Sequence, residues 1–152
     1  FVGVDFSLGM LQAARRRARK KGIENAVFIR ADVAQLPFAE DVFDGSFSFA
    51  GFHAFPDPAA ASMEISRVLR PNSPFLMTVI CHGVRAISDW MIDKVMVPKG
   101  YFSKGRPASQ YQANLEKSGI TQQVTEMTGA MMVSFGHKQN DATGLGGSQD
   151  PN

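Results

Sequence analysis

The chain has 152 residues, 44% of them hydrophobic and 20% charged, which is typical of one soluble globular domain and excludes a disordered or collagen-like chain. Its single cysteine, Cys81, excludes an internal disulfide and a cysteine zinc cluster, and it favours a reducing compartment, either the cytoplasm or an organelle interior. The longest apolar run, residues 74–81, is far shorter than the roughly 20 residues of a membrane-spanning helix, so no membrane span is expected.

The net charge is only +2, but six of the seven residues from Arg15 to Lys21 are basic. No aromatic residue interrupts this run, so we interpret it as a solvated helix face and expect no nucleic-acid partner. The chain begins with Phe1 inside a strand-like run. We therefore expect it to be part of a longer protein, with any targeting segment upstream.

The first elements alternate between strand and helix patterns. Residues 1–5 form a short apolar strand that ends in a carboxylate, and Ser7 caps a helix that runs to about Lys21. Further strands are expected at residues 26–30 and 43–50. Buried strands separated in this way pair in parallel.

The middle of the chain continues the alternation. Asp57 is the predicted N-cap of a helix over residues 58–70, which a strand at residues 75–81 follows. Apolar spacing over residues 84–95 predicts an amphipathic helix, ahead of a loop over residues 97–108.

The last elements are a helix and a hairpin. Ser109 and Gln112 match a capping box for a helix that ends at Gly119. The strands of a closing hairpin flank Gly129, at residues 120–126 and 130–135. Polar residues 137–152 predict a disordered tail. The whole order predicts an α/β fold, with a Rossmann-like, mostly parallel sheet, helices on both faces and a C-terminal antiparallel hairpin.

Asp5 stands at the carboxyl end of a predicted buried strand. Open α/β sheets bind ligands at this end, and a carboxylate there can accept hydrogen bonds from a ribose diol. A simple helix-capping role explains the same residue equally well.

Three stretches of the sequence carry a resemblance to a known family: VGVDFSLGML, RADVAQLPF and RVLRPNSPFLMTV. Together they resemble a class I S-adenosylmethionine-dependent methyltransferase, and in particular the ubiquinone and menaquinone C-methyltransferases of the type 11 group. The match covers residues 1–80 and continues more loosely to residue 138. It implies a partial methyltransferase domain over residues 1–136 that uses S-adenosylmethionine and methylates a small-molecule or lipid-like acceptor.

The resemblance also implies roles for individual residues. Asp5 would bind the ribose hydroxyls, Asp32 the adenine amino group, and the Val33 N–H a ring nitrogen. The residues expected beside the adenine or methionine portions are Phe6, Met10, Phe49 and Ala50. Ordinary core packing is the alternative for the three larger apolar side chains, and a turn role is the alternative for Asp32.

Two departures from the family pattern stand out. The family's first strand and helix, with the glycine-rich loop between them, would lie upstream of Phe1. We therefore expect the sheet to be interrupted between the strands ending at Asp5 and Ala50, and this chain alone to bind the cofactor poorly. The second departure is Asn72, Ser73 and Pro74, where relatives carry glycines after the proline.

No obligatory catalytic residue follows from methyl transfer, because holding the acceptor in line supplies most of the catalysis. His53, just past a strand end, is the best-placed base, and His82 is the second; a structural role is the alternative for both. No metal site is expected. The apolar residues of segment 84–107 suggest a lid over a hydrophobic acceptor, or else core packing.

Two other functions remain open on the sequence. A nicotinamide-dependent dehydrogenase also places an acidic residue at a strand end, although the hairpin and ADVAQLPF argue against it. A truncated, inactive remnant or a binding module is the other alternative. The sequence identifies neither the acceptor nor the oligomeric state.

Overall fold

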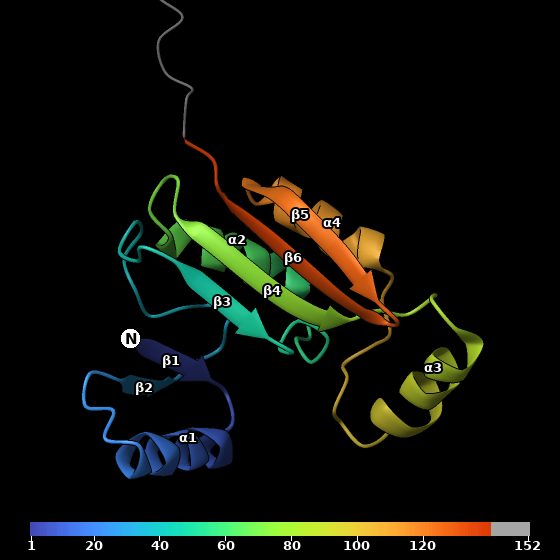
Figure 1. Cartoon of the computed structure of the whole chain (residues 1–152), viewed down its shortest axis with the longest axis horizontal. Coiled ribbons are helices and arrows are strands. Elements are labelled where there is room, and N and C mark those ends of the chain that lie inside the picture. The colour runs from blue at the N-terminus through green and yellow to red at the C-terminus, as the bar shows by residue number, and fades with distance from the viewer. Residues whose placement is uncertain (141–152) are drawn as a thin grey trace, which may run out of the picture.

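The computed structural model describes residues 1–140, in which strands and helices alternate along the chain (Figure 1). The strands are β1 (Val2–Asp5), β2 (Val27–Arg30), β3 (Ser46–Phe49), β4 (Pro74–Ile80), β5 (Ile120–Thr128) and β6 (Met131–Lys138). The helices are α1 (Leu8–Lys20), α2 (Pro58–Val68), α3 (Ala86–Met91), the π-helical turn η1 (Ile92–Met96) and α4 (Ala108–Lys117).

The strands form two sheets. β1 and β2 make a parallel pair, while the second sheet has the order β3-β4-β6-β5. In this second sheet β3 and β4 are parallel, and β6 runs antiparallel to both of its neighbours. The α/β class and the closing hairpin are thus confirmed, and the sheet is mixed, with two antiparallel pairings in it and one parallel.

The expected interruption between β1 and β3 is present. Among residues 1–140, β1 pairs only with β2, and β3 pairs with β4 on one side only. The rings of Phe1 and Phe47 stack across this gap, with centroids 5.8 Å apart. Side-chain contact therefore takes the place of a backbone ladder between the two sheets.

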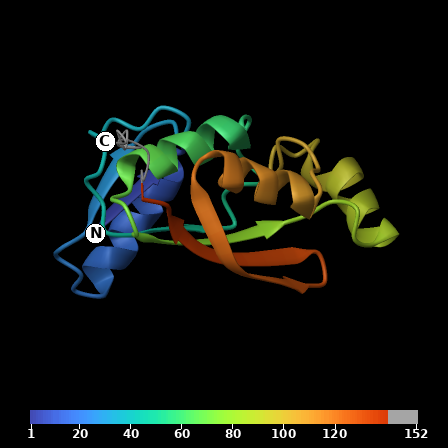
Figure 2. The same cartoon turned by 90° about the horizontal axis from the view of Figure 1, so that it is seen from above.

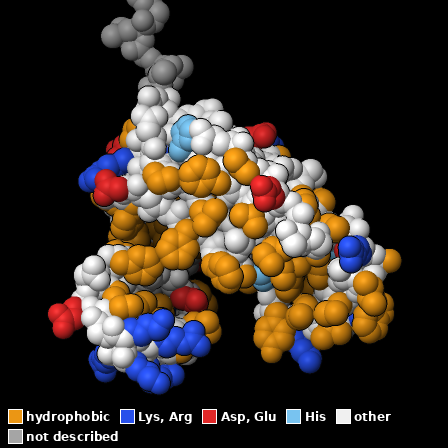
Figure 3. Space-filling view, in the orientation of Figure 1, with side chains coloured by type: hydrophobic (Ala, Val, Ile, Leu, Met, Phe, Trp, Pro, Cys, Tyr) orange, Lys and Arg blue, Asp and Glu red, His pale blue; other side chains and the backbone are white. Residues whose placement is uncertain are grey.

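The main hydrophobic core lies between the four-stranded sheet and helices α2 and α4, which cover the same face (Figure 2). Strand alternation sends Phe75, Met77 and Val79 into this core. The opposite face exposes Phe47, Leu76 and Phe135, and apolar side chains line it (Figure 3). Within residues 1–140, the helices that pack on this sheet thus lie on one face, while α1 packs against β1 and β2.

Two of the three helix caps that the sequence predicts are present. The Ser7 hydroxyl accepts a hydrogen bond from the Met10 N–H, and the Asp57 carboxylate caps the start of α2, so both predicted caps are confirmed. The capping box at Ser109 is wrong. Helix α4 begins at Ala108 behind the extended backbone of Pro107, and no side chain caps it.

The amphipathic helix predicted over residues 84–95 is helical in the structure, but it is not one regular helix. Its first part is the short helix α3, which has no buried residue, and its second part is η1, in which only Ile92 is buried. Ile87, one of the apolar residues on which that prediction rests, is 72% exposed. The apolar stripe does not pack on the sheet, because this segment projects away from it (Figure 1).

The predicted tail begins too early. Strand β6 continues to Lys138, whose ammonium donates to Asp41 Oδ1 at 2.7 Å and to the Leu69 carbonyl at 2.8 Å. The rest of the predicted tail, residues 141–152, lies outside the described residues. Within residues 1–140, no helix combines the length and the apolar character needed to cross a bilayer.

Candidate cofactor site

The candidate site is the edge of the fold where β1, β2 and β3 end. β1 and β2 are parallel with Asp5 opposite Arg30, so Asp5 and the loop after β2 leave the sheet at the same edge. β3 runs in a similar direction and ends at Phe49 (Figure 1). Figure 3 shows the surface hollowed between the part that carries α1 and the part that carries α3, and the ends of β1 and β3 point toward this hollow.

The Asp5 carboxylate has one oxygen engaged in a local contact. Its Oδ1 accepts the Ser7 N–H at 2.7 Å, so the residue does support the start of α1. Within residues 1–140 no hydrogen bond engages its Oδ2. A capping role and a ligand-binding role are therefore compatible, because each uses a different oxygen.

Asp32 lies in a turn just after β2, and its side chain is exposed. Its Oδ1 accepts the Ala34 N–H at 2.9 Å, which closes the turn. The next residue, Val33, packs against the main core. The turn therefore fixes its own backbone and presents the carboxylate outward.

Three apolar residues predicted at the site are exposed rather than buried. The exposed fractions are 68% for Phe6, 60% for Met10 and 78% for Phe49. Core packing within residues 1–140 does not explain them. An apolar surface beside the carboxylate of Asp5 suits a nucleoside, in which a flat nucleobase is joined to a polar sugar.

Ala50 adopts a left-handed backbone with φ +53°, which is uncommon for a residue other than glycine. Its N–H donates to both the carbonyl and the hydroxyl oxygen of Thr78, each at 3.0 Å. Thr78, on β4, therefore holds the end of β3 and directs Phe49 outward. No sequence signal marked Thr78.

Arg30 is a second residue that the sequence analysis missed. Its Nε donates to the Phe6 carbonyl at 2.9 Å, and its guanidinium lies 5.3 Å from the centre of the Phe6 ring. The local sequence around Asp5 shows no basic neighbour, but parallel pairing places Arg30 opposite it. A cation thus stands at the candidate site and stacks on one of its aromatic rings.

His53, the predicted base, is buried. Its ring stacks on Phe102 with centroids 4.1 Å apart and an interplanar angle of 23°. The Ile80 N–H points to its Nδ1 at 3.5 Å. Burial lowers the pKa of His53, so the imidazole is neutral near pH 7.

The loop after η1 is tied down over His53. The Ser103 N–H donates to the His53 carbonyl at 3.0 Å, and its hydroxyl donates to the Phe55 carbonyl at 2.7 Å. Arg106 adds a bond to the Pro56 carbonyl at 3.1 Å. Phe102 and this loop therefore cover one face of the imidazole.

His82, the second candidate base, has carboxylates beside both ring nitrogens. Asp93 Oδ2 lies 3.2 Å from its Nε2, and Asp89 Oδ1 lies 3.9 Å from its Nδ1. These contacts connect the end of β4 to α3 and η1 and favour a structural role. Across residues 1–140, no group of three or more His, Cys, Asp or Glu side chains could hold a metal ion.

Cys81 is fully buried next to these elements. Burial raises the pKa of its thiol to about 11. The thiol is protonated near pH 7, so it does not serve as a nucleophile in the folded state.

Comparison with known proteins identifies the family. Residues 1–132 match a family described as a methyltransferase domain. The chain is 43% identical over 71 residues to a demethylmenaquinone methyltransferase of Corynebacterium kroppenstedtii, covering 47% of this chain and 28% of that protein. It is 30% identical over 101 residues to a 2-phytyl-1,4-naphtoquinone methyltransferase of a Nostoc species, covering 63% and 44%.

Solved structures show the same fold. A putative methyltransferase from Bacillus halodurans superposes with a TM-score of 0.79 at 16% identity, covering 91% of this chain and 83% of that one. The chain spans less than half the length of either curated relative above. With a family match over most of its length, the chain belongs to the methyltransferase domain family, of the class I S-adenosylmethionine-dependent type.

Proposed function

We propose that this domain binds S-adenosylmethionine across the ends of β1, β2 and β3. One observation carries the proposal: two carboxylates follow a pair of parallel strands at one edge, and exposed apolar side chains accompany them. Asp5 would accept from the ribose hydroxyls, and Asp32 from the adenine amino group. Phe6 and Met10 would pack against the base, and Phe49 and Ala50 would border the methionine portion.

The proposed acceptor is a small, lipid-like molecule. By their names, the two curated relatives above act on demethylmenaquinone and on 2-phytyl-1,4-naphtoquinone, which are both quinones. The segment 84–107 supports this choice, because Ile87, Trp90 and Tyr101 are 60% exposed or more. An exposed apolar surface beside the site can cover an apolar substrate. We propose that the segment acts as the acceptor-side lid.

When bound, S-adenosylmethionine supplies an activated methyl group. The residues of the domain would mainly orient the acceptor in line with it and exclude water. If methylation releases a proton, His53 would accept it, since its lowered pKa leaves the ring neutral. This role requires the imidazole, which is 7% exposed here, to become accessible to the acceptor.

The test uses the whole protein that contains this domain. Calorimetry should show micromolar binding of S-adenosylhomocysteine. Methyl-labelled cofactor should then be supplied with separate pools of quinols, phenols, fatty acids and RNA. Label in the quinol or phenol pool is expected. Absence of cofactor binding would refute the cofactor site, and label in RNA alone would refute the acceptor class.

A further inference from the structure

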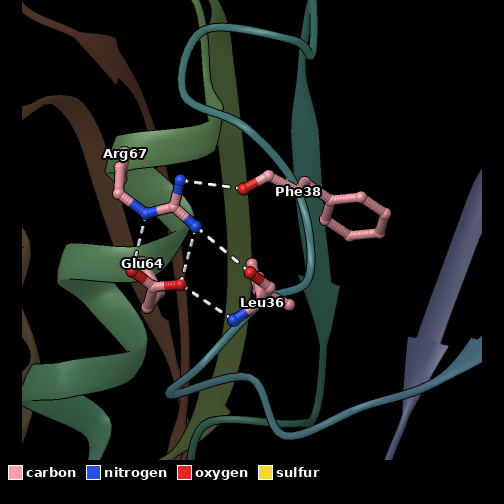
Figure 4. Close-up of polar contacts among 4 residues, drawn as sticks. All are labelled: Leu36, Phe38, Glu64 and Arg67. Atoms are coloured by element: carbon pink, nitrogen blue, oxygen red, sulfur yellow. Dashed lines mark hydrogen bonds and ion pairs between the residues drawn. The ribbon is translucent and has the colours of Figure 1, made fainter.

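The loop after β2, residues 31–45, is tied to helix α2 by two side chains (Figure 4). Glu64 Oε2 accepts the Leu36 N–H at 2.8 Å. Arg67 donates to the Leu36 carbonyl at 3.2 Å and to the Phe38 carbonyl at 2.9 Å. The Leu36 peptide is thus held on both of its polar groups by partners about 30 residues further along the chain.

Glu64 and Arg67 also hold each other in a fixed geometry. Their two contacts, Nε to Oε1 at 2.7 Å and Nη2 to Oε2 at 2.9 Å, make a bidentate pair on one face of α2. The hydrogen bond from Arg67 lowers the pKa of Glu64, so the carboxylate stays charged. Because the planar guanidinium reaches the carboxylate and both loop carbonyls, a lysine could not replace it without losing contacts.

The later part of the same loop is attached differently. Residues 41–43 hydrogen-bond through their backbone to the end of α2 and to Arg70 just after it. Side chains also hold this part: Asp44 makes an exposed ion pair with Arg70, and Asp41 pairs with Lys138 of β6 at 2.7 Å. Arg70 also donates to the Asp41 carbonyl at 3.1 Å. Around Leu36, by contrast, the described hydrogen bonds to α2 all come from Glu64 and Arg67.

The contacts of Glu64 and Arg67 with Leu36, called the Leu36 tie below, lie next to the Asp32 turn. That turn is closed by its own bonds, because the Gln35 N–H donates to the Asp32 carbonyl at 3.0 Å, and Leu36 is the next residue. At its N-terminal end the turn is joined to β2, which belongs to the two-stranded sheet. Phe49 belongs to the four-stranded sheet, on which α2 packs. Together with the packing of Val33 against the main core, the Leu36 tie therefore sets where the turn lies relative to β3.

We propose that Glu64 and Arg67 are positioning residues for the cofactor. They hold the Asp32 turn at the place where one cofactor molecule reaches both this turn and the end of β3. The proposal rests on the proposed function, since it takes Asp32 and Val33 as the groups that recognise the adenine.

The experiment compares two ligands on the whole protein: S-adenosylhomocysteine and its 6-oxopurine analogue. The analogue lacks the amino group that would donate a hydrogen bond to Asp32. It also carries a proton on the ring nitrogen that would accept a hydrogen bond from the Val33 N–H. The wild type should bind S-adenosylhomocysteine more tightly than the analogue. The ratio of the two dissociation constants, called the adenine preference below, measures how strongly the turn discriminates between the two bases. Partial unfolding lowers both affinities equally and leaves this ratio unchanged.

The variants are Glu64→Gln and Arg67→Lys, with Arg70→Ala as the matched control at the other end of the loop. Each of the first two should weaken S-adenosylhomocysteine binding by about 5- to 20-fold and shrink the adenine preference. Arg70→Ala should keep the wild-type ratio. Because only folded molecules bind either ligand, the ratio of dissociation constants does not depend on the folded fraction. A partly unfolded variant therefore still tests whether Glu64 and Arg67 position the turn.

Asp32→Asn separates the two proposals. If it abolishes the adenine preference while Glu64→Gln and Arg67→Lys both keep it, the positioning role is wrong and the cofactor assignment stands. If the wild type shows no adenine preference, or if Asp32→Asn leaves that preference unchanged, the assignment of Asp32 is wrong. The positioning role is then wrong as well.

Discussion

The imidazole of His53 lies nearly parallel to the ring of Phe102, 4.1 Å away between centroids, and the loop that carries Phe102 is hydrogen-bonded over it. The contact removes water from a titratable group. Burial is the reason that the pKa of His53 is lowered. The pairing therefore makes stability depend on pH.

The first prediction concerns that dependence. The unfolded chain binds a proton on His53 at the ordinary pKa of about 6.5, whereas the native state binds it only at lower pH. As pH falls below about 6.5, the free energy of unfolding should therefore decrease, until pH passes the native pKa. Urea unfolding from pH 7 to 5 should show a smaller decrease for His53→Gln than for the wild type. Identical slopes would contradict the lowered pKa.

The second prediction separates catalysis by His53 from its structural role. With an acceptor that must lose a proton, His53→Ala should lower kcat by about 10²-fold or more and leave cofactor affinity unchanged. His137→Ala is the matched control, because His137 lies on β6 opposite Pro74, at the other end of β4. Unchanged turnover in His53→Ala on a good acceptor would remove His53 from the mechanism.

The third prediction concerns Asp5. Asp5→Ala should weaken cofactor binding by roughly 10- to 100-fold, because charge-assisted hydrogen bonds to the ribose are lost. The substitution also removes the contact to the Ser7 N–H. Ser7→Ala is therefore the control, since it weakens the start of α1 without removing the carboxylate. Equal cofactor affinities for Asp5→Ala and the parent protein would show that the ribose assignment is wrong.

Local chemistry explains which elements the sequence predicts well. The side chains of Ser7 and Asp57 each accept from N–H groups two or three residues further on. All the residues that determine these caps therefore lie within a few positions of the sequence. Asn72 shows the same principle: it adopts φ +62°, a left-handed backbone that asparagine tolerates better than most residues.

Contacts between distant segments account for what the sequence missed. Arg30 reaches the site only through parallel pairing with β1, and Glu64 meets Leu36 across 28 residues. The periodicity of residues 84–95 correctly indicates helical structure but not its surroundings. An apolar stripe predicts burial only where another element covers it, and within residues 1–140 little covers this one.

The fourth prediction tests the two capping assignments together. Asp57→Ala should destabilise the domain by about 0.5–2 kcal/mol, because two N–H groups at the start of α2 lose their acceptor. Ser109→Ala should have little effect, because Ser109 lies inside α4 and caps nothing. Urea unfolding midpoints measure both. A larger loss for Ser109→Ala than for Asp57→Ala would restore the capping box and overturn the observed start of α4.

The last prediction concerns the proposed lid. Trp90 and Ile87 on α3 are 60% and 72% exposed, and within residues 1–140 nothing buries them. If they cover an apolar acceptor, Trp90→Ala should raise the KM for a long-chain quinol by about tenfold, because a buried aromatic contact is lost, and should leave cofactor affinity unchanged. Met63→Ala is the matched control, since Met63 is 55% exposed on α2, the helix behind the sheet. The effect should grow with the length of the acceptor's apolar chain, because each added methylene has more lid surface to contact. Equal KM changes for Trp90→Ala and Met63→Ala, or a change independent of chain length, would show that α3 does not contact the acceptor.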